Sequence, residues 1–309
     1  MYRKLLRALI QISLVIVGGF AVLVGLNFPY NYDRPVSQEE ILAAQAFYAA
    51  AYAKPAVEAK QDEYETKYLR TAEWAAGEFD IAGQVRAFVE EHKLSDKAVL
   101  EVGSGRGNLQ DMVDNYTGLD ISSNVERFYK KKFVLGSATA LPFHDSSFDA
   151  LWSIFVLEHV QNPEQAFSEA RRVVKNGGLM FWLPAWNCYP WLADGYNERP
   201  YSDFGLYGKI VKATIPLRSS MGYRVATTMP IRMVRARVAK HGPTTLRYRR
   251  LNPNYKEYWG PDSDALNSID GYEAVMWFIS RGDECLSCAG SPIFFPLSHA
   301  PLIIRVQKG

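Results

Sequence analysis

A glycine-rich turn is the first feature of this 309-residue chain that points to chemistry. A short apolar run that contains Glu101 leads into three glycines at alternate positions, Gly103, Gly105 and Gly107. Glycine adopts positive φ freely and lets the backbone approach a ligand closely. The dinucleotide fingerprint G-x-G-x-x-G is not met, because Asn108 stands where its third glycine belongs. The turn therefore indicates a ligand-binding loop, but not the dinucleotide-binding loop of a dehydrogenase.

Two further polar residues follow later apolar runs. Asp120 ends the second run, where its carboxylate can accept two hydrogen bonds from a ribose diol. The alternative for Asp120 is an ordinary turn or helix-cap acid. His159 follows the fourth run and titrates near neutral pH, so it is the candidate general base. A structural histidine at a helix start is the alternative, with Glu158 as a second candidate for the base.

Short apolar runs alternate with amphipathic segments between residues 98 and 183, and this alternation predicts a parallel sheet with helices on both faces. We expect its strands at 98–102, 116–120, 133–137, 148–154 and 179–183, with helices at 108–114, 124–131 and 164–174. A helix at 272–280 and a strand at 302–307 complete the sheet. Three helices, at 37–53, 62–78 and 81–92, are expected to precede it.

Four landmarks at the right mutual spacing make the chain resemble the class I S-adenosylmethionine-dependent methyltransferases, closely their small-molecule branch with the quinone-biosynthesis enzymes. The resemblance covers residues 98–184 and, more loosely, the C-terminal helix and strand. The landmarks are the glycine turn with Glu101, the strand end at 116–120, Leu141-Pro142-Phe143 with Ser147-Phe148-Asp149, and Leu157-Glu158-His159-Val160 followed by Asn176-Gly177-Gly178. The resemblance implies a Rossmann-like seven-stranded methyltransferase sheet.

The resemblance also implies S-adenosylmethionine as the cofactor and assigns parts of its site. Glu101 would face the amino group of the methionine moiety, and the three glycines would pass beneath that moiety and the ribose. Asp120 would bind the ribose hydroxyls. The family usually carries an acid after the third strand for the adenine amino group, but this chain has Ser137 and Ala138 there, which offer a hydroxyl acceptor and a backbone donor. No metal ligand set is expected.

The N-terminal segment predicts a membrane anchor. Residues 8–28 contain no charge, and at about 1.5 Å per helical residue they span a hydrocarbon core of ~30 Å. A cleaved signal peptide is the alternative, because Arg3, Lys4 and Arg7 precede the apolar run. By the positive-inside rule, the same cations place the N-terminus in the cytoplasm and the rest of the chain across the membrane. S-adenosylmethionine is made in the cytosol, however, and this favours a catalytic domain on the cytoplasmic side. We expect a single-pass membrane protein with a cytoplasmic catalytic domain.

The net charge of +2, from 35 Lys and Arg against 33 Asp and Glu, excludes an electrostatic nucleic-acid binder. The charge is uneven, because residues 205–250 contain eleven basic and no acidic residues. This stretch is predicted to contact an anionic membrane or a phosphate-bearing acceptor, with a solvated face as the alternative. Within it, Ile231, Val234 and Val238 have the spacing of an interfacial helix.

The remaining candidates are cysteines, aromatic residues and three aspartates in the C-terminal part of the chain. Three cysteines cannot form a disulfide framework, and we interpret Cys285 and Cys288 as an incidental pair rather than a redox or zinc site. Aromatic residues after the fifth strand are expected to wall the acceptor, with half of them as possible core, namely Trp182, Trp186, Tyr189, Trp191, Tyr196 and Tyr201. Asp262, Asp264 and Asp270 either face the pocket or cap loops.

Five segments follow from these observations. They are an anchor at 1–30, a helical extension at 31–95, a cofactor-binding core at 96–184, an aromatic and basic lid at 185–260, and a C-terminal part at 261–309. The predicted function is membrane-anchored methyl transfer to an oxygen of a small-molecule, glycan or lipid-linked acceptor. A catalytically inactive methyltransferase-fold scaffold at the membrane is the alternative.

Overall fold

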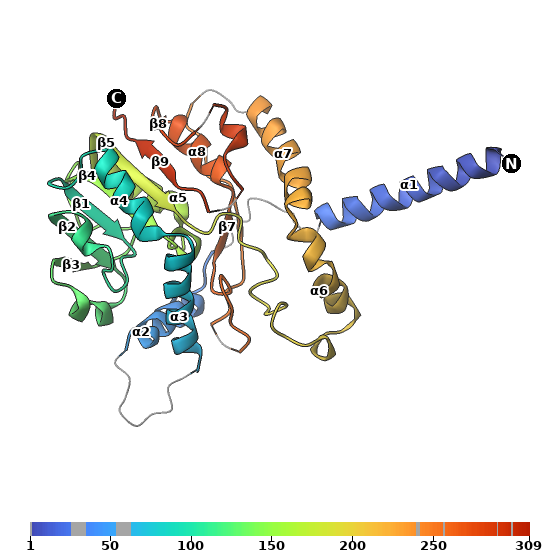
Figure 1. The fold of residues 1–309 in the computed structure, drawn as a ribbon, viewed down its shortest axis with the longest axis horizontal. Coiled ribbons are helices and arrows are strands. Elements are labelled where there is room, and N and C mark those ends of the chain that lie inside the picture. Colours follow the sequence, from blue (N-terminus) through green and yellow to red (C-terminus); the bar gives the residue numbers. More distant parts are fainter. Residues whose placement is uncertain are drawn as a thin grey trace.

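A seven-stranded sheet forms the core of the α/β domain on the left of Figure 1 in this computed structural model. The structure describes residues 2–25, 35–53, 63–238, 242–255, 257–288, 290–297 and 299–309. The strands are β1 (Ala98–Val102), β2 (Asn115–Asp120), β3 (Lys132–Leu135), β4 (Phe148–Ile154), β5 (Val174–Leu183), β8 (Glu284–Cys285) and β9 (Leu302–Arg305). Their order is β3-β2-β1-β4-β5-β9-β8. The first five strands are parallel, whereas β9 and β8 run antiparallel to their neighbours.

Helices cover both faces of this sheet, because alternate side chains along each strand point to opposite sides. On one side, α4 (Ile81–Glu91) packs against Val99 and Ala150. On the other side, α5 (Pro163–Val173) and α8 (Gly271–Ile279) pack against Leu100 and Leu151. The predicted α/β fold with a seven-stranded Rossmann-like sheet is therefore confirmed.

The helices expected at 108–114 and 124–131 are wrong. The structure has only the short 3-10 turns η1 (Gln110–Met112) and η2 (Ser123–Phe128) at these places. The glycine turn takes up about half of the connection between β1 and β2, which leaves room for one turn of helix. The Gln110 side chain fastens the two turns together, because its amide nitrogen donates to the Phe128 carbonyl at 3.2 Å and its oxygen accepts from the Lys130 amide at 2.7 Å.

Three helices precede β1 in addition to α4. The helix α2 (Gln38–Ala51) begins with the expected capping box, in which Ser37 and Glu40 bond each other's backbone amides at 3.2 and 2.8 Å. The helix α3 (Glu63–Glu78) lies beside α2 at the edge of the sheet, whereas α1 (Tyr2–Gly25) extends away from the domain (Figure 1).

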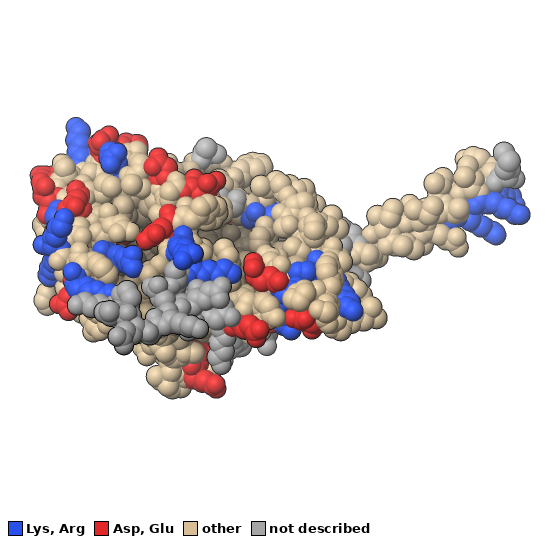
Figure 2. Space-filling model, turned by 60° about the horizontal axis from the view of Figure 1, so that its bottom comes forward, with Lys and Arg blue, Asp and Glu red and all other residues tan. Residues whose placement is uncertain are grey.

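Within the described residues, no helix combines the length and apolarity that crossing a membrane requires. The anchor predicted over 8–28 is therefore not supported. The helix α1 also contains Arg3, Lys4 and Arg7, and these cations form a group near its free end (Figure 2). Residues 26–28 of the predicted anchor lie outside the described part of the chain.

The segment between β5 and α8 contains η4 (Tyr201–Asp203), α6 (Leu206–Arg218), α7 (Met221–Val238) and the antiparallel pair β6 (Tyr248–Arg250) and β7 (Asn267–Ile269). Several large apolar side chains of α6 and α7 point outward, including Leu217, Met221 and Val225, which are 52%, 58% and 41% exposed. Arg218 and Arg232 point inward and are 4% and 1% exposed. The alternative of a solvated basic face is therefore wrong for these two arginines.

The cysteine pair at the edge of the sheet is covalently linked. Cys285, at the end of β8, and Cys288 form a disulfide, so their interpretation as an incidental pair is wrong. Cys188 is a buried free thiol. A short 3-10 turn, η5 (Pro292–Phe294), precedes β9. No group of His, Cys, Asp and Glu that could hold a metal ion occurs among the residues with described positions.

Candidate functional site

A cavity of about 380 Å³ lies at the carboxyl ends of β1, β2 and β4. This edge of an open parallel sheet is where such folds bind ligands. The glycine turn forms the floor of the cavity, and Tyr48, Tyr52 and Tyr68 from α2 and α3 form part of its cover. The volume lies within the range of small-molecule and cofactor sites.

The glycine turn has the conformation that the sequence predicts. Gly103, Gly105 and Gly107 have φ angles of 71°, 49° and 68°, which side chains rarely allow. Gly103 also lacks space for a side chain, because a Cβ there would lie 2.2 Å from Cγ2 of Val156. The turn therefore keeps its backbone close to the cavity.

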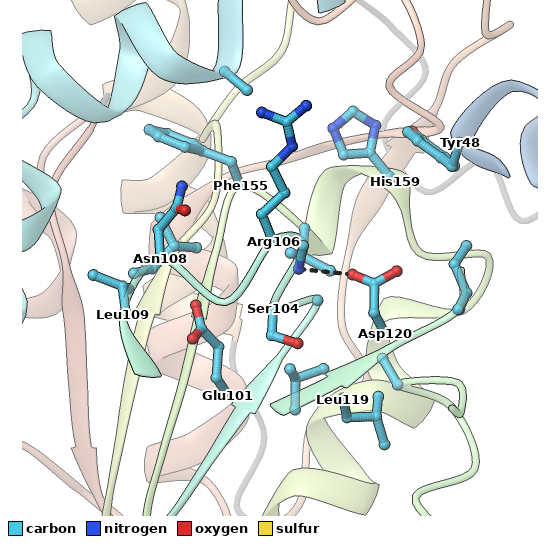
Figure 3. Close-up of a pocket in the computed structure, with 18 of the residues that line it drawn as sticks. Tyr48, Glu101, Ser104, Arg106, Asn108, Leu109, Leu119, Asp120, Phe155 and His159 are labelled. Atoms are coloured by element: carbon cyan, nitrogen blue, oxygen red, sulfur yellow. Dashed lines mark hydrogen bonds between the residues drawn. The ribbon is translucent and has the colours of Figure 1, made fainter. Parts of the chain in front are cut away.

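Asp120 is fixed at the end of β2 by two backbone donors. The amide of Gly105 donates to Oδ2 at 2.9 Å (Figure 3). The amide of Ser122 donates to Oδ1, also at 2.9 Å. The residue is 8% exposed, and burial raises the pKa of its carboxyl group against the lowering effect of these bonds. Each oxygen keeps a lone pair, so the side chain can accept further hydrogen bonds from a ligand diol in a fixed orientation.

Glu101 is a buried acid at the end of β1. The hydroxyl of Tyr116 donates to its Oε2. Burial raises the pKa of Glu101 to about 7, even though the bond from Tyr116 lowers it. No described lysine or arginine forms an ion pair with Glu101. A ligand that brings an ammonium group would supply the missing charge, and this fits the methionine end of S-adenosylmethionine.

The opposite end of the cavity is less polar. Ser137 and Ala138 line it as expected, but the Ser137 hydroxyl already shares a 2.9 Å hydrogen bond with Oγ1 of Thr139. Ile121, which follows Asp120, is 48% exposed and lines the same cavity. Its apolar side chain offers a surface for a flat ring. Ile121 is not among the residues predicted from the sequence, although its position directly after the predicted ribose ligand is a usable signal.

His159 belongs to η3 (Leu157–His159), a 3-10 turn after β4, and lines the same cavity near Tyr48 (Figure 3). Its Nδ1 lies 3.2 Å from the backbone oxygen and 3.6 Å from Oδ2 of Asp264. The Tyr48 hydroxyl donates to the same Oδ2 at 2.8 Å. The structure therefore brings together one histidine, one acid and one tyrosine from three distant parts of the chain.

Several acids surround this histidine and set its protonation. Burial favours the neutral imidazole, but the charges of Asp264 and Glu158 outweigh burial and raise the pKa of His159. Burial also raises the pKa of Glu158 to about 7 and that of Asp262 to about 6. Oε1 of Glu158 accepts from the Ala185 amide at 3.1 Å and lies 3.9 Å from Nε2 of His159. These groups can exchange a proton near neutral pH.

The aromatic residues that line the cavity are not the ones predicted from the sequence. None of the six aromatic residues predicted for it lines the cavity, and Trp182, Trp186 and Trp191 are buried elsewhere. The wall instead consists of tyrosines from α2 and α3, with Phe47 and Trp259 packed behind Tyr68. Periodicity could show that α2 and α3 are helices, but it could not show that they fold over the sheet edge.

The late acids separate into two places. Asp264 contacts His159, and Asp262 is half-buried and lies close enough to influence it electrostatically. Asp270 lies elsewhere, where it caps α8 through the Tyr272 amide at 3.2 Å and binds Arg232. Of the predicted candidates, Asp262 and Asp264 thus join the histidine, whereas Asp270 is a structural cap.

Comparison with known proteins agrees with this geometry. Residues 100–182 match the family model described as a methyltransferase domain. A demethylmenaquinone methyltransferase of Renibacterium salmoninarum is 38% identical over 91 residues, which cover 26% of this chain and 38% of that protein. A fatty-acid O-methyltransferase of Mycolicibacterium smegmatis is 28% identical over 187 residues, which cover 53% of this chain and 66% of that protein.

A solved structure, a SAM-dependent methyltransferase from Aquifex aeolicus, superposes with a TM-score of 0.30 at 17% identity, and covers 33% of this chain and 64% of that chain. The chain spans about half the length of the curated relatives that it matches. The matched family segment contains the glycine turn, Asp120, the Ser137 region and His159. Residues 100–182 are therefore a class I methyltransferase domain whose cofactor is S-adenosylmethionine.

Proposed function

We propose that the chain transfers a methyl group from S-adenosylmethionine to a small-molecule acceptor. The observation that carries this proposal is that one cavity joins the fixed Asp120 and the cation-free Glu101 to the pair His159–Asp264. When bound, the cofactor supplies a methyl group on a sulfonium, which is already a good leaving group. The protein then has to align the acceptor and, where the acceptor is a hydroxyl, remove its proton.

The lining supports a hydroxyl-bearing acceptor with an aromatic or apolar body. His159 would accept the hydroxyl proton, and Asp264 would stabilise the resulting imidazolium. Tyr48, Tyr52 and Tyr68 offer ring surface with polar tips on the same side of the cavity. The names of two relatives, a demethylmenaquinone methyltransferase and a fatty-acid O-methyltransferase, describe enzymes with apolar acceptors. We therefore propose a phenolic, quinol or lipid-like acceptor.

The test is transfer of a labelled methyl group by the full chain to quinols, phenols and fatty acids, together with calorimetric titration of S-adenosylmethionine. Asp120→Ala should weaken cofactor binding at least about tenfold, because two charge-assisted hydrogen bonds are lost. Asp111→Ala, an exposed acid on η1 outside the cavity, is the matched control and should bind normally. Equal binding by Asp120→Ala and the control would refute the cofactor site.

A second candidate is a methyltransferase-fold scaffold that binds the cofactor without turnover. One observation favours it, since Ser137 stands where an acid usually binds adenine and its hydroxyl is shared with Thr139. The same experiment separates the two candidates. Cofactor binding without transfer to any acceptor class would favour the scaffold, whereas transfer to one acceptor that His159→Ala abolishes would favour the enzyme.

We also propose that the outer face of α6 and α7 lies on a lipid bilayer. Large apolar side chains on this face are exposed without cover, from Leu206 at 78% to Val225 at 41%. Lys209 and Arg237 are exposed on the same two helices and suit anionic headgroups. Contiguous apolar surface of this kind marks interaction sites in soluble domains.

Vesicle flotation tests this membrane contact. Leu217→Glu together with Met221→Glu should lower binding to phosphatidylglycerol vesicles by at least about tenfold, because apolar burial is replaced by charge repulsion. The control is Asp145→Ala with Asp111→Ala, two exposed acids away from this face. Binding that survives the double variant would refute the contact, and a dimer broken by that variant in sedimentation would assign the face to a second copy.

A further inference from the structure

A second cavity lies on the inner side of α6 and α7 and shares no lining residue with the cofactor cavity. Its volume is about 60 Å³, several times the roughly 10–15 Å³ that one water molecule needs. Three of its twelve lining residues are arginines and none is acidic, and the lining is Asn187, Cys188, Tyr189, Pro190, Trp191, Arg218, Tyr223, Arg224, Thr227, Thr228, Arg249 and Ser268. The walls therefore concentrate positive charge in a space that fits a small anion.

Arg218 is the most deeply placed of these arginines. It is 4% exposed, and its guanidinium lies over the ring of Trp191 with Cζ 4.3 Å from the ring centroid. Its Nη2 donates to the Val211 carbonyl at 2.8 Å and its Nε to Oγ1 of Thr214 at 3.1 Å, so both bonds go to neutral atoms of its own helix. Burial lowers the pKa of Arg218. A buried guanidinium without an anion is costly in free energy.

Arg224 repeats this arrangement on α7. Its Nη2 donates to the carbonyl of Leu297, and its Cζ lies 5.5 Å from the ring centroid of Tyr189. Neither Arg218 nor Arg224 forms an ion pair with any described acid. The buried side chains of Thr227 and Thr228 line the cavity beside them, and the Thr227 hydroxyl already donates to the Tyr223 carbonyl at 2.9 Å.

Two other arginines of α7 have a carboxylate partner, as guanidinium groups that point inward usually do. Arg232 binds the carboxylate of Asp270 with Nε and Nη2, and Nε of Arg235 lies 3.4 Å from Oε1 of Glu273. The protein thus provides carboxylates for Arg232 and Arg235 and leaves Arg218 and Arg224 facing a cavity. The absent partner at that cavity is best supplied by a ligand.

We propose that the cavity between residues 187–191 and the α6–α7 pair binds a phosphate-type oxyanion, held by Arg218 and Arg224. Guanidinium groups form paired N–H···O bonds with phosphate oxygens, and threonine hydroxyls complete such sites. The anion is either free phosphate or the headgroup of a phospholipid or phosphorylated compound. This proposal does not depend on methyl transfer, because the two cavities are separate.

The experiment is calorimetric titration of inorganic phosphate into the full chain at constant ionic strength. Arg218→Lys and Arg224→Gln should each weaken phosphate binding at least about tenfold, because a point charge or an amide cannot replace the forked donor. Arg237→Gln is the matched control, because this arginine is exposed on the same helix and lies outside the cavity lining. Its phosphate affinity should be unchanged.

Thermal unfolding keeps the proposal testable if Arg218→Lys folds poorly. Each variant is compared with itself in phosphate and in chloride of equal ionic strength, so differences in basal stability cancel. The wild type and Arg237→Gln should gain melting temperature in phosphate, while Arg224→Gln should not. No phosphate binding by the wild type, or an equal gain in all variants, would overturn the proposal, because the effect would then be a general salt effect.

Vesicles distinguish the source of the phosphate. Phosphatidylcholine vesicles are compared with and without phosphatidic acid, using the wild type, Arg224→Gln and, as control, Arg86→Gln, an exposed arginine of α4 outside the cavity lining. Selective binding of phosphatidic acid that only Arg224→Gln loses would support the site with a lipid headgroup as its ligand. Calorimetric phosphate binding without that selectivity would support the site with a soluble ligand.

Discussion

At the scale of single residues, the cofactor cavity contains two buried acids in different electrostatic settings. Asp120 accepts hydrogen bonds from two backbone amides, whereas Glu101 has one tyrosine donor and no described cation. The pKa of Glu101 rises to about 7, and burial is the main cause. An acid kept in this state without ligand destabilises the folded chain once it ionises.

Glu101→Gln should therefore stabilise the free protein in a pH-dependent way. Between the ordinary glutamate pKa of 4.5 and about 7, the wild-type folded state binds more protons than the unfolded state, so wild-type stability falls as pH rises. The loss is about 1.4 kcal/mol for each unit of pKa shift. In urea unfolding, the free energy of unfolding of Glu101→Gln relative to that of the wild type should increase across this window. The difference should then stay constant above pH 7. S-adenosylmethionine should then stabilise the wild type more than the variant, and a pH-independent difference would contradict this account.

Asp264 should set the pH profile of methyl transfer through His159. A histidine must be neutral to accept a proton from the acceptor, so activity should rise with pH as the His159 imidazolium loses its proton. Asp264→Asn removes a charge that raises the pKa of His159, so the acidic limb of the kcat profile should move to lower pH. Tyr48→Phe leaves that charge in place and should keep the limb nearer its wild-type position. A limb that stays fixed in Asp264→Asn would exclude His159 as the titrating base.

At the scale of elements, sequence patterns succeeded wherever a local rule decides the structure. The capping box at Ser37, the positive-φ glycines and the strands at 98–102 and 148–154 all follow from neighbouring residues. Prediction failed where distant contacts decide, as for the tyrosines of α2 and α3 that cover the cavity. Local patterns also did not show that Arg218 and Arg232 point inward, because helical spacing alone does not say which face of a helix is inside.

The junction of α7 with α8 is a point where one substitution should act on several elements. Arg232 binds Asp270, the N-cap of α8, and its Nη1 also donates to the carbonyls of Ile293 and Phe295 at 2.7 and 2.6 Å. Asp270→Ala leaves a buried cation without its acid, and should lower the free energy of unfolding by about 3–5 kcal/mol. Urea unfolding measures this loss.

The control for this prediction is Glu284→Ala. Glu284 lies 2.7 Å from Arg305, but both side chains are more than two-fifths exposed. Such a surface pair contributes about 0–1 kcal/mol. Comparable losses in Asp270→Ala and Glu284→Ala would show that burial of the Arg232 pair adds nothing to stability.

At the scale of the whole molecule, charges of both signs are interspersed over the face shown in Figure 2. The long helix α1 stands apart from this body, and its side chains from Tyr2 to Gly19 are all exposed. Stability of the domain therefore resides in the two layers of helices that enclose the sheet, where clusters of buried apolar residues meet.

Removal of residues 2–25 should accordingly leave the melting temperature within about 1–2 °C of the full chain, because no described side chain of α1 is buried. Self-association should decrease, since Leu9, Leu14 and Val15 are more than half exposed. Thermal unfolding and light scattering measure the two effects. A large fall in melting temperature would show that α1 packs against the domain in solution.

The inverted polarity of α6 and α7 also determines how the chain tolerates mutation. In most surface helices charged positions accept substitution and apolar positions resist it. Here Arg218 and Arg232 are buried, while Leu217, Met221 and Val225 face outward. A deep mutational scan scored by folding should therefore show Arg218 and Arg232 as sensitive and Leu217, Met221 and Val225 as permissive, which is the reverse of the order that hydropathy predicts for these five positions.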